Sequence, residues 1–173
     1  VMRHPMAVAL SKQAHSDWLW TWSPEAFIDQ HEWVEDHLTD HVEVLMRVAR
    51  EGSVLEKLVG VWAVLQLTAL RSAPSESMPI VHYESAVLDP WASVKFLSEH
   101  PAWRGMLTAD AQQVGDAAER VSFVSKSAAP NVLPNPSHWI SKVSNHERKG
   151  CEQLLDDLGM GGWHDDRGMP VDE

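Results

Sequence analysis

Scarce residue types set the first limits on this chain. It has a single cysteine, Cys151, which excludes an internal disulfide and any metal site built from several cysteines. No apolar run approaches the roughly 18 residues of a membrane-spanning helix, and no signal peptide is visible. Lys and Arg number 14 against 25 Asp and Glu, which gives a net charge of -11. This excess of acid excludes general nucleic-acid binding, which needs a basic face, but it allows a local basic pocket for one small anion.

The residue types that are plentiful indicate a folded domain. With 173 residues, 44% of them hydrophobic, the chain is long enough for one domain with a sizeable core. Nine tryptophans supply large flat surfaces for a core or a cleft. We expect one domain over 1–160, followed by a loose tail over 161–173. Because the pattern starts in mid-element at Val1, we also expect further chain upstream of it.

Most of the periodic signals are helical. Pro5 suits an early helix position, Ser23-Pro24-Glu25 is a helix start, and Ser144 to Glu147 reads as a capping box. Apolar residues then recur at three-to-four spacing, and they surround the second long helix almost completely, so we expect that helix to be central. The predicted helices cover 6–14, 25–50, 53–72, 90–97, 108–120 and 144–159, with a loop over 125–136.

Only two stretches read as strands. Val1 to Arg3 has the character of a strand end, and "MPIVHYE" at 78–84 reads as a strand with Ile80 and Val81 buried in its middle. Two separated strands do not form a stable sheet alone. We therefore predict an α/β fold, a partial parallel sheet of the P-loop type that is mostly helical in the portion present.

The start of the chain has the features of an anion site. A strand end followed by a helix start presents free backbone N–H groups and the positive end of the helix dipole. Arg3 adds a fork of donors that matches phosphate. Ser11 lies two turns into the helix, and its side chain leans back toward the N-terminus. The alternative is an arginine paired with a surface carboxylate and a serine on a solvated face.

Two motifs together resemble a known enzyme family. "VMRHPMAVALS" at 1–11 and "VHYESAVLDPWASVKFL" at 81–97 are similar, in type, spacing and order, to sulfotransferases that use 3′-phosphoadenosine-5′-phosphosulfate (PAPS). The resemblance implies that Arg3 and Ser11 bind the 3′-phosphate of PAPS and that Tyr83 contacts its adenosine. It covers residues 1 to about 160, with Ser85-Ala86 departing from the usual pattern. An ordinary packing role for Tyr83 is the alternative.

Weaker matches extend the resemblance. "VSFVSK" at 121–126 is similar to an adenine-packing segment of the family, with Phe123 in the aromatic place and Val121 replacing a threonine. "RKG" at 148–150 is similar to a phosphate clamp, but it lies inside the last predicted helix and reads better as a solvated helical face.

The resemblance also implies what this chain lacks. The family's 5′-phosphosulfate loop and its general base lie upstream of the arginine turn, so we expect the chain to be incomplete and inactive alone. The family transfers a sulfuryl group to a hydroxyl or amine of a small-molecule or glycan acceptor and uses no metal. The acceptor, the oligomeric state and the compartment, cytoplasm or Golgi lumen, stay open.

Other hypotheses are a related P-loop kinase and a helical binding domain without catalysis. His37 and His41 are four residues apart and could share a metal with Asp40 or Glu43, but a polar helix face rich in His and acid is the preferred interpretation. His4 and His15 flank the candidate turn and could support it. Trp18, Trp20 and Trp22 could line an acceptor cleft or simply pack beneath the next helix.

Overall fold

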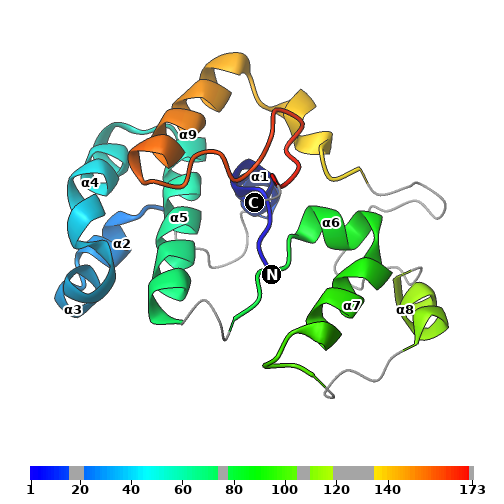
Figure 1. Ribbon diagram of the computed structural model, residues 1–173. Helices are drawn as coiled ribbons and strands as arrows, with labels where there is room; N and C mark the ends of the chain where they lie inside the picture. Colours follow the sequence, from blue (N-terminus) through cyan, green and yellow to red (C-terminus); the bar gives the residue numbers. More distant parts are fainter. Residues whose placement is uncertain (16–21, 74–77, 105–109, 119–134, 172–173) are drawn as a thin grey trace.

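A computed structural model describes residues 1–15, 22–73, 78–104, 110–118 and 135–171 (Figure 1). Within these ranges the chain is mostly helical, as the sequence predicts. None of the described helices is both long enough and apolar enough to cross a bilayer. In chain order the elements are α1 (Pro5–Ala14), α2 (Glu25–Ile28), α3 (His31–Trp33), the π turn η1 (Val34–Leu38), the 3-10 turn η2 (Thr39–His41), α4 (Val42–Glu51), α5 (Val54–Ser72), α6 (Tyr83–Leu88), α7 (Pro90–Glu99), α8 (Ala111–Ala118), the 3-10 turn η3 (His138–Lys142) and α9 (Asn145–Asp157).

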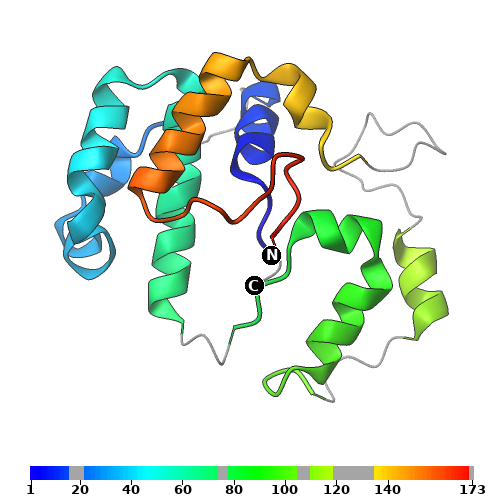
Figure 2. The same cartoon turned by 45° about the horizontal axis from the view of Figure 1, so that its top comes forward.

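Helix α5 is the centre of the larger helical group, as predicted for the helix at 53–72. Its N-terminus is closed by a capping box, in which the Glu56 amide donates to Ser53 Oγ (3.2 Å) and the Ser53 amide donates to Glu56 Oε2 (2.8 Å). Helices α1, α4 and α9 pack against it (Figures 1 and 2). The buried α5 residues are Leu55, Leu58, Val59, Gly60, Val61, Trp62, Ala63 and Val64.

The prediction of one continuous helix over 25–50 is wrong. The backbone of Gln30 is extended (φ -97°, ψ 98°), and the segment then passes through the π turn η1 and the 3-10 turn η2 before α4 begins. Tertiary contacts explain the interruption. The Trp33 indole donates to Thr68 Oγ1 on α5 (2.8 Å), and Arg71 donates to the His37 carbonyl (2.7 Å). These bonds and the burial of Leu38 fix the segment against α5 and outweigh its helical periodicity.

The predicted parallel sheet is not seen in the described ranges. Met2 and His82 form an isolated parallel bridge, and the predicted strand at 78–84 stops there because Tyr83 begins α6. Ile80, expected to be buried, has 38% of its surface exposed. The physical reason is that one bridged pair has too few hydrogen bonds to extend a strand, and no other described strand flanks it.

Helices α6, α7 and α8 form a second group beside the first (Figure 2). Asp89 caps α7, as the Asp-Pro pair predicts, by accepting from the Ala92 amide (2.8 Å). The predicted capping box of α9 is also present, with the Glu147 amide donating to Ser144 Oγ (3.3 Å).

The C-terminal segment, residues 161–171, turns back beside α1 (Figures 1 and 2). His164 and Pro170 form an antiparallel bridge within it. Gly168 has a positive φ of 74°, and a Cβ there would lie 2.8 Å from the Trp139 ring, so only glycine lets the segment approach η3 this closely. The sequence-based boundary at 160 thus separates His164 from residues that it contacts.

We expect Leu58→Ala to lower the free energy of unfolding by about 2–5 kcal/mol, because its side chain is fully buried on α5 and its loss leaves a cavity. Leu65→Ala on the same helix is the matched control. Leu65 is 41% exposed, so its truncation should change stability by only about 0.5 kcal/mol. Urea unfolding of the two variants measures both values. Equal effects would contradict the central position of α5.

Candidate anion site and adjoining histidine cluster

The two motifs that define the candidate site lie side by side. The Met2 amide donates to the Val81 carbonyl (2.8 Å), and the Tyr83 amide donates to the Met2 carbonyl (2.7 Å). This parallel pairing puts Arg3 next to Tyr83 although 80 positions separate them in the chain. The structure brings the two side chains together, and their roles in one nucleotide site stay a prediction.

Arg3 packs its guanidinium over the Tyr83 ring. The guanidinium carbon lies 4.7 Å from the ring centroid, a cation–π contact. Arg3 is half-buried, and within the described ranges no carboxylate forms an ion pair with it. The described residues therefore do not show the alternative, in which Arg3 pairs with a surface carboxylate. The charge is held at a fixed place with its hydrogen-bonding capacity available to an anion.

Glu84 fixes the turn that follows Arg3. Its side chain is 0% exposed, and its Oε1 accepts from the His4 amide (2.8 Å). Sequence reasoning matched Glu84 to the family motif but gave it no role. The only hint was the spacing of His82 and Glu84, because residues two apart in a strand share one face. The second carboxylate oxygen, Oε2, is buried without a hydrogen-bond partner among the described residues.

Helix α1 begins directly after this turn. His4 is its N-cap residue and Pro5 its first residue, and no described side chain caps its amides. An anion beside this end would lie at the positive end of the helix dipole. Ser11 is half-buried farther along α1, and no direct contact joins it to Arg3. Phe123 lies outside the described residues, so its predicted adenine contact stays a prediction.

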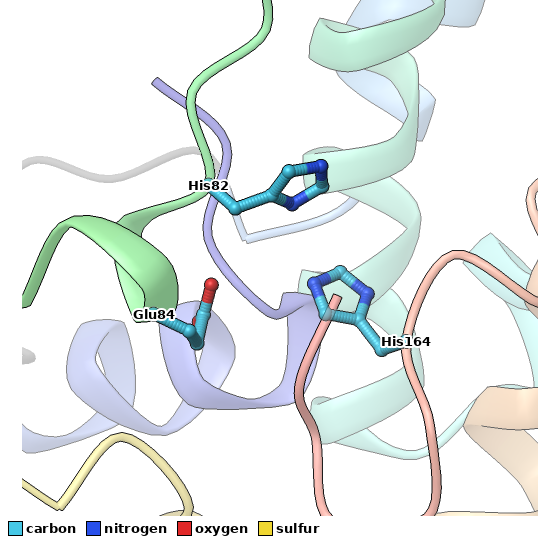
Figure 3. Close-up of side chains that lie close together, drawn as sticks. All are labelled: His82, Glu84 and His164. Atoms are coloured by element: carbon cyan, nitrogen blue, oxygen red, sulfur yellow. The ribbon is translucent and has the colours of Figure 1, made fainter. Parts of the chain in front are cut away.

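A cluster of aromatic side chains continues from the turn toward the C-terminal segment. The His4 ring stacks on Trp139, with centroids 4.0 Å apart and planes 19° apart. The His164 ring meets His4 edge-on at 4.6 Å, and His82 meets His164 at 5.8 Å. Figure 3 shows the side chains of His82, Glu84 and His164 pointing toward one another. Sequence reasoning missed this cluster, because nothing local in 161–173 indicates that His164 contacts residues at the start of the chain.

Burial favours the neutral form of His4 and His164. It lowers the pKa of His4 from 6.5 to about 3, with smaller effects from His164 and Arg148. It likewise lowers the pKa of His164 from 6.5 to about 4, with a smaller effect from His82. A neutral imidazole keeps a lone pair on one ring nitrogen, so these side chains can accept a hydrogen bond or ligate a metal.

His4 and His164 also line a cavity of about 260 Å³. Arg148 lines it, but its charge is already paired, with Glu152 Oε1 at 2.6 Å and Asp166 Oδ1 at 3.6 Å. Arg148 is on α9, so "RKG" lies on a helix, as the helical interpretation predicts.

The neighbouring Cys151 is buried, and burial raises the pKa of its thiol to about 12, which makes it a poor nucleophile.

The structure gives little support to the candidate metal pair on the first long helix or to the candidate tryptophan cleft. Arg71 lies beside the His41 imidazole and donates to the His37 backbone carbonyl. Its guanidinium lies 3.3 Å from Asp40 Oδ2 and 3.5 Å from His41 Nε2. A cation there leaves no place for a metal ion. Trp18 and Trp20 lie outside the described residues, and Trp22 is 36% exposed.

The neutral histidines predict a loss of stability in mild acid. The unfolded chain binds a proton at each histidine near pH 6.5, whereas folded His4 and His164 resist protonation down to about pH 3 and 4. The contribution of the two neutral histidines to the free energy of unfolding is complete above pH 6.5. It is lost as the pH falls toward their pKa values in the folded protein. We expect the urea midpoint of the metal-free protein to fall steadily from pH 7 to pH 5, before most carboxylates titrate.

His4→Phe is the variant that tests the origin of this slope. It keeps a ring against Trp139 and removes the titrating imidazole that faces His164 and Arg148. The slope should become shallower in His4→Phe and stay unchanged in the exposed control His31→Gln. An unchanged slope in His4→Phe would contradict the assignment.

No protein-family model, curated protein or solved structure matches this chain. The two motifs and the contacts between them are therefore the basis for assigning a function.

Proposed function

We propose that the turn at Arg3 binds the 3′-phosphate of PAPS, or of its product 3′-phosphoadenosine-5′-phosphate, in a sulfotransferase-like nucleotide site. One observation carries the proposal. The two motifs of the family resemblance, distant in sequence, are joined by a parallel bridge and by the buried bond from His4 to Glu84. A chance similarity of two short motifs gives no reason for them to meet in the fold.

The chemistry of the turn suits a phosphate dianion. The Arg3 guanidinium supplies a planar pair of donors and a fixed positive charge. The N-terminus of α1 adds the positive end of its dipole, and the Ser11 hydroxyl can contribute from the same helix. Tyr83 is 38% exposed and holds the Arg3 fork against its ring, so its remaining surface is available to the adenosine.

A partial parallel sheet of the P-loop type belongs to the same proposal. Its support is the parallel sense of the bridge between Met2 and His82. Helix α1 begins at Pro5, shortly after Met2, and α6 begins directly after His82. Successive strand-to-helix units of a parallel sheet have this arrangement, and ligands bind where the strands end. The Arg3 turn follows Met2 and Tyr83 follows His82, so both come directly after the bridged pair.

The proposal concerns nucleotide binding, and no described residue is assigned to sulfuryl transfer. The family's reaction moves the sulfuryl group to a hydroxyl or amine of a small-molecule or glycan acceptor, with the bisphosphate nucleotide as leaving group. A binding domain without catalysis would use the same 3′-phosphate site. A P-loop kinase would select a 5′-triphosphate and would not need a 3′-phosphate.

Calorimetry with 3′-phosphoadenosine-5′-phosphate and with 5′-AMP, which lacks the 3′-phosphate, tests the proposal. We expect the bisphosphate to bind more tightly. Arg3→Ala should weaken bisphosphate binding by about 10- to 100-fold, the value of a charge-assisted hydrogen-bonded contact, and leave 5′-AMP almost unaffected. Arg3→Lys keeps the charge but not the planar pair of donors, so its affinity for the bisphosphate should lie between those of the unmodified protein and Arg3→Ala.

Arg50→Ala is the matched control, because Arg50 is an exposed arginine on α4. It should bind the bisphosphate like the unmodified chain. The proposal fails if the unmodified protein does not prefer the bisphosphate over 5′-AMP, or if Arg3→Ala retains full affinity.

A further inference from the structure

Three potential metal-ligating side chains converge beside the Arg3 turn (Figure 3). His82 precedes α6, Glu84 lies in the first turn of α6, and His164 comes from the C-terminal segment. One ligand atom of each lies within 4.8 Å of the other two. Within the described ranges, no other group of three His, Cys, Asp or Glu side chains comes together in this way.

The surroundings of Glu84 require a compensating positive group. Its side chain is 0% exposed, yet its carboxylate accepts one hydrogen bond, at Oε1. Oε2 is buried and has no hydrogen-bond partner among the described residues, and the same holds for His164 Nε2. Burying a carboxylate with so little compensation is strongly unfavourable unless a cation or further donors face it. The Arg3 guanidinium does not form an ion pair with it.

We propose that His82, Glu84 and His164 bind one divalent transition-metal ion, with Zn²⁺ as the best match. Two imidazole nitrogens and a carboxylate oxygen form a donor set that suits Zn²⁺, whereas Ca²⁺ and Mg²⁺ take oxygen ligands. With ligand bonds of about 2.0–2.2 Å, the three donor atoms close by roughly 1 Å around the ion. Each donor is at the end of a rotatable side chain, so side-chain rotation is the movement that the site would need.

The site is adjacent to solvent through His82. His82 lines a surface cavity of about 630 Å³ together with Phe96 and Trp163. Water from this side completes a tetrahedral set with three protein ligands. The resemblance to sulfotransferases implies no metal. The proposal of a metal site therefore does not depend on the proposed nucleotide binding.

The bound ion connects three separate parts of the chain. It joins the segment before α6 to the C-terminal segment, and its Glu84 ligand also holds the His4 amide at the start of α1. Metal binding therefore stabilises the folded protein and restrains the turn that carries Arg3.

Zinc titration of the full chain, stripped of metal with a chelator, tests the site. We expect one Zn²⁺ per chain by calorimetry and a rise in the melting temperature with zinc. Co²⁺ should give the visible absorption of a four-coordinate ion. His164→Ala should weaken binding by at least about 100-fold, because changes to mere outer-shell partners already lower affinity 10- to 100-fold.

Two further variants sharpen the result. Glu84→Gln keeps the volume and an oxygen that accepts from His4, so a loss of zinc binding with a native circular dichroism spectrum separates ligation from folding. His31→Ala removes an exposed histidine that pairs with Glu35 and should leave affinity within about twofold. The proposal is overturned if the unmodified chain shows no saturable site for Zn²⁺. It is also overturned if His164→Ala binds like the unmodified chain, or if His31→Ala removes the binding.

Discussion

The bond from the His4 amide to the Glu84 carboxylate connects the start of the chain to its second helical group. It is buried, and it joins residues 80 positions apart. The bridge between Met2 and His82 alone is one backbone pair, which has little independent stability. With Glu84 attached to the turn, Arg3 has a defined position and α1 has a defined entry angle. The anion site and the histidine cluster both depend on this contact.

The same carboxylate explains why polar groups are buried in this part of an otherwise apolar core. A hydrogen bond to a charged acceptor is stronger than one between neutral groups, and a buried environment increases the difference. The arrangement satisfies Oε1 and leaves Oε2 without a hydrogen-bond partner among the described residues, while the Glu84 side chain points toward His82 and His164 (Figure 3). One oxygen thus serves the architecture of the turn, and the other is available for a ligand. A purely structural role would be fulfilled better by two donors from the protein.

The features that could be predicted from sequence are local ones. Ser144 with Glu147 and Asp89 with Pro90 act on neighbours within one turn, so their spacing is sufficient to place the helix starts. The helix predicted over 25–50 failed because Trp33 and Arg71 make tertiary bonds that no periodicity reveals.

In the candidate site, too, the sequence could predict some features and not others. The resemblance implies that Arg3 and Tyr83 bind one nucleotide, but neither it nor the composition predicts the contact between their side chains. His164 could not be placed, because its neighbours are set by the return of the C-terminal segment and by the close approach of Gly168 to Trp139. Long-range contacts of this kind depend on the packing of the whole fold.

The net charge of -11 gives the last constraint on function. The proposed ligand, a nucleotide bisphosphate, would approach a surface whose overall field repels it, so long-range steering would not supply the affinity. The attraction must come from groups within hydrogen-bonding distance, where Arg3 and the N-terminus of α1 act in a partly dehydrated turn. Salt screens the distant repulsion more than these close contacts, so such a site loses less affinity with ionic strength than a basic surface does. An acidic protein with one local cation therefore favours a small, specifically held anion over an extended polyanion.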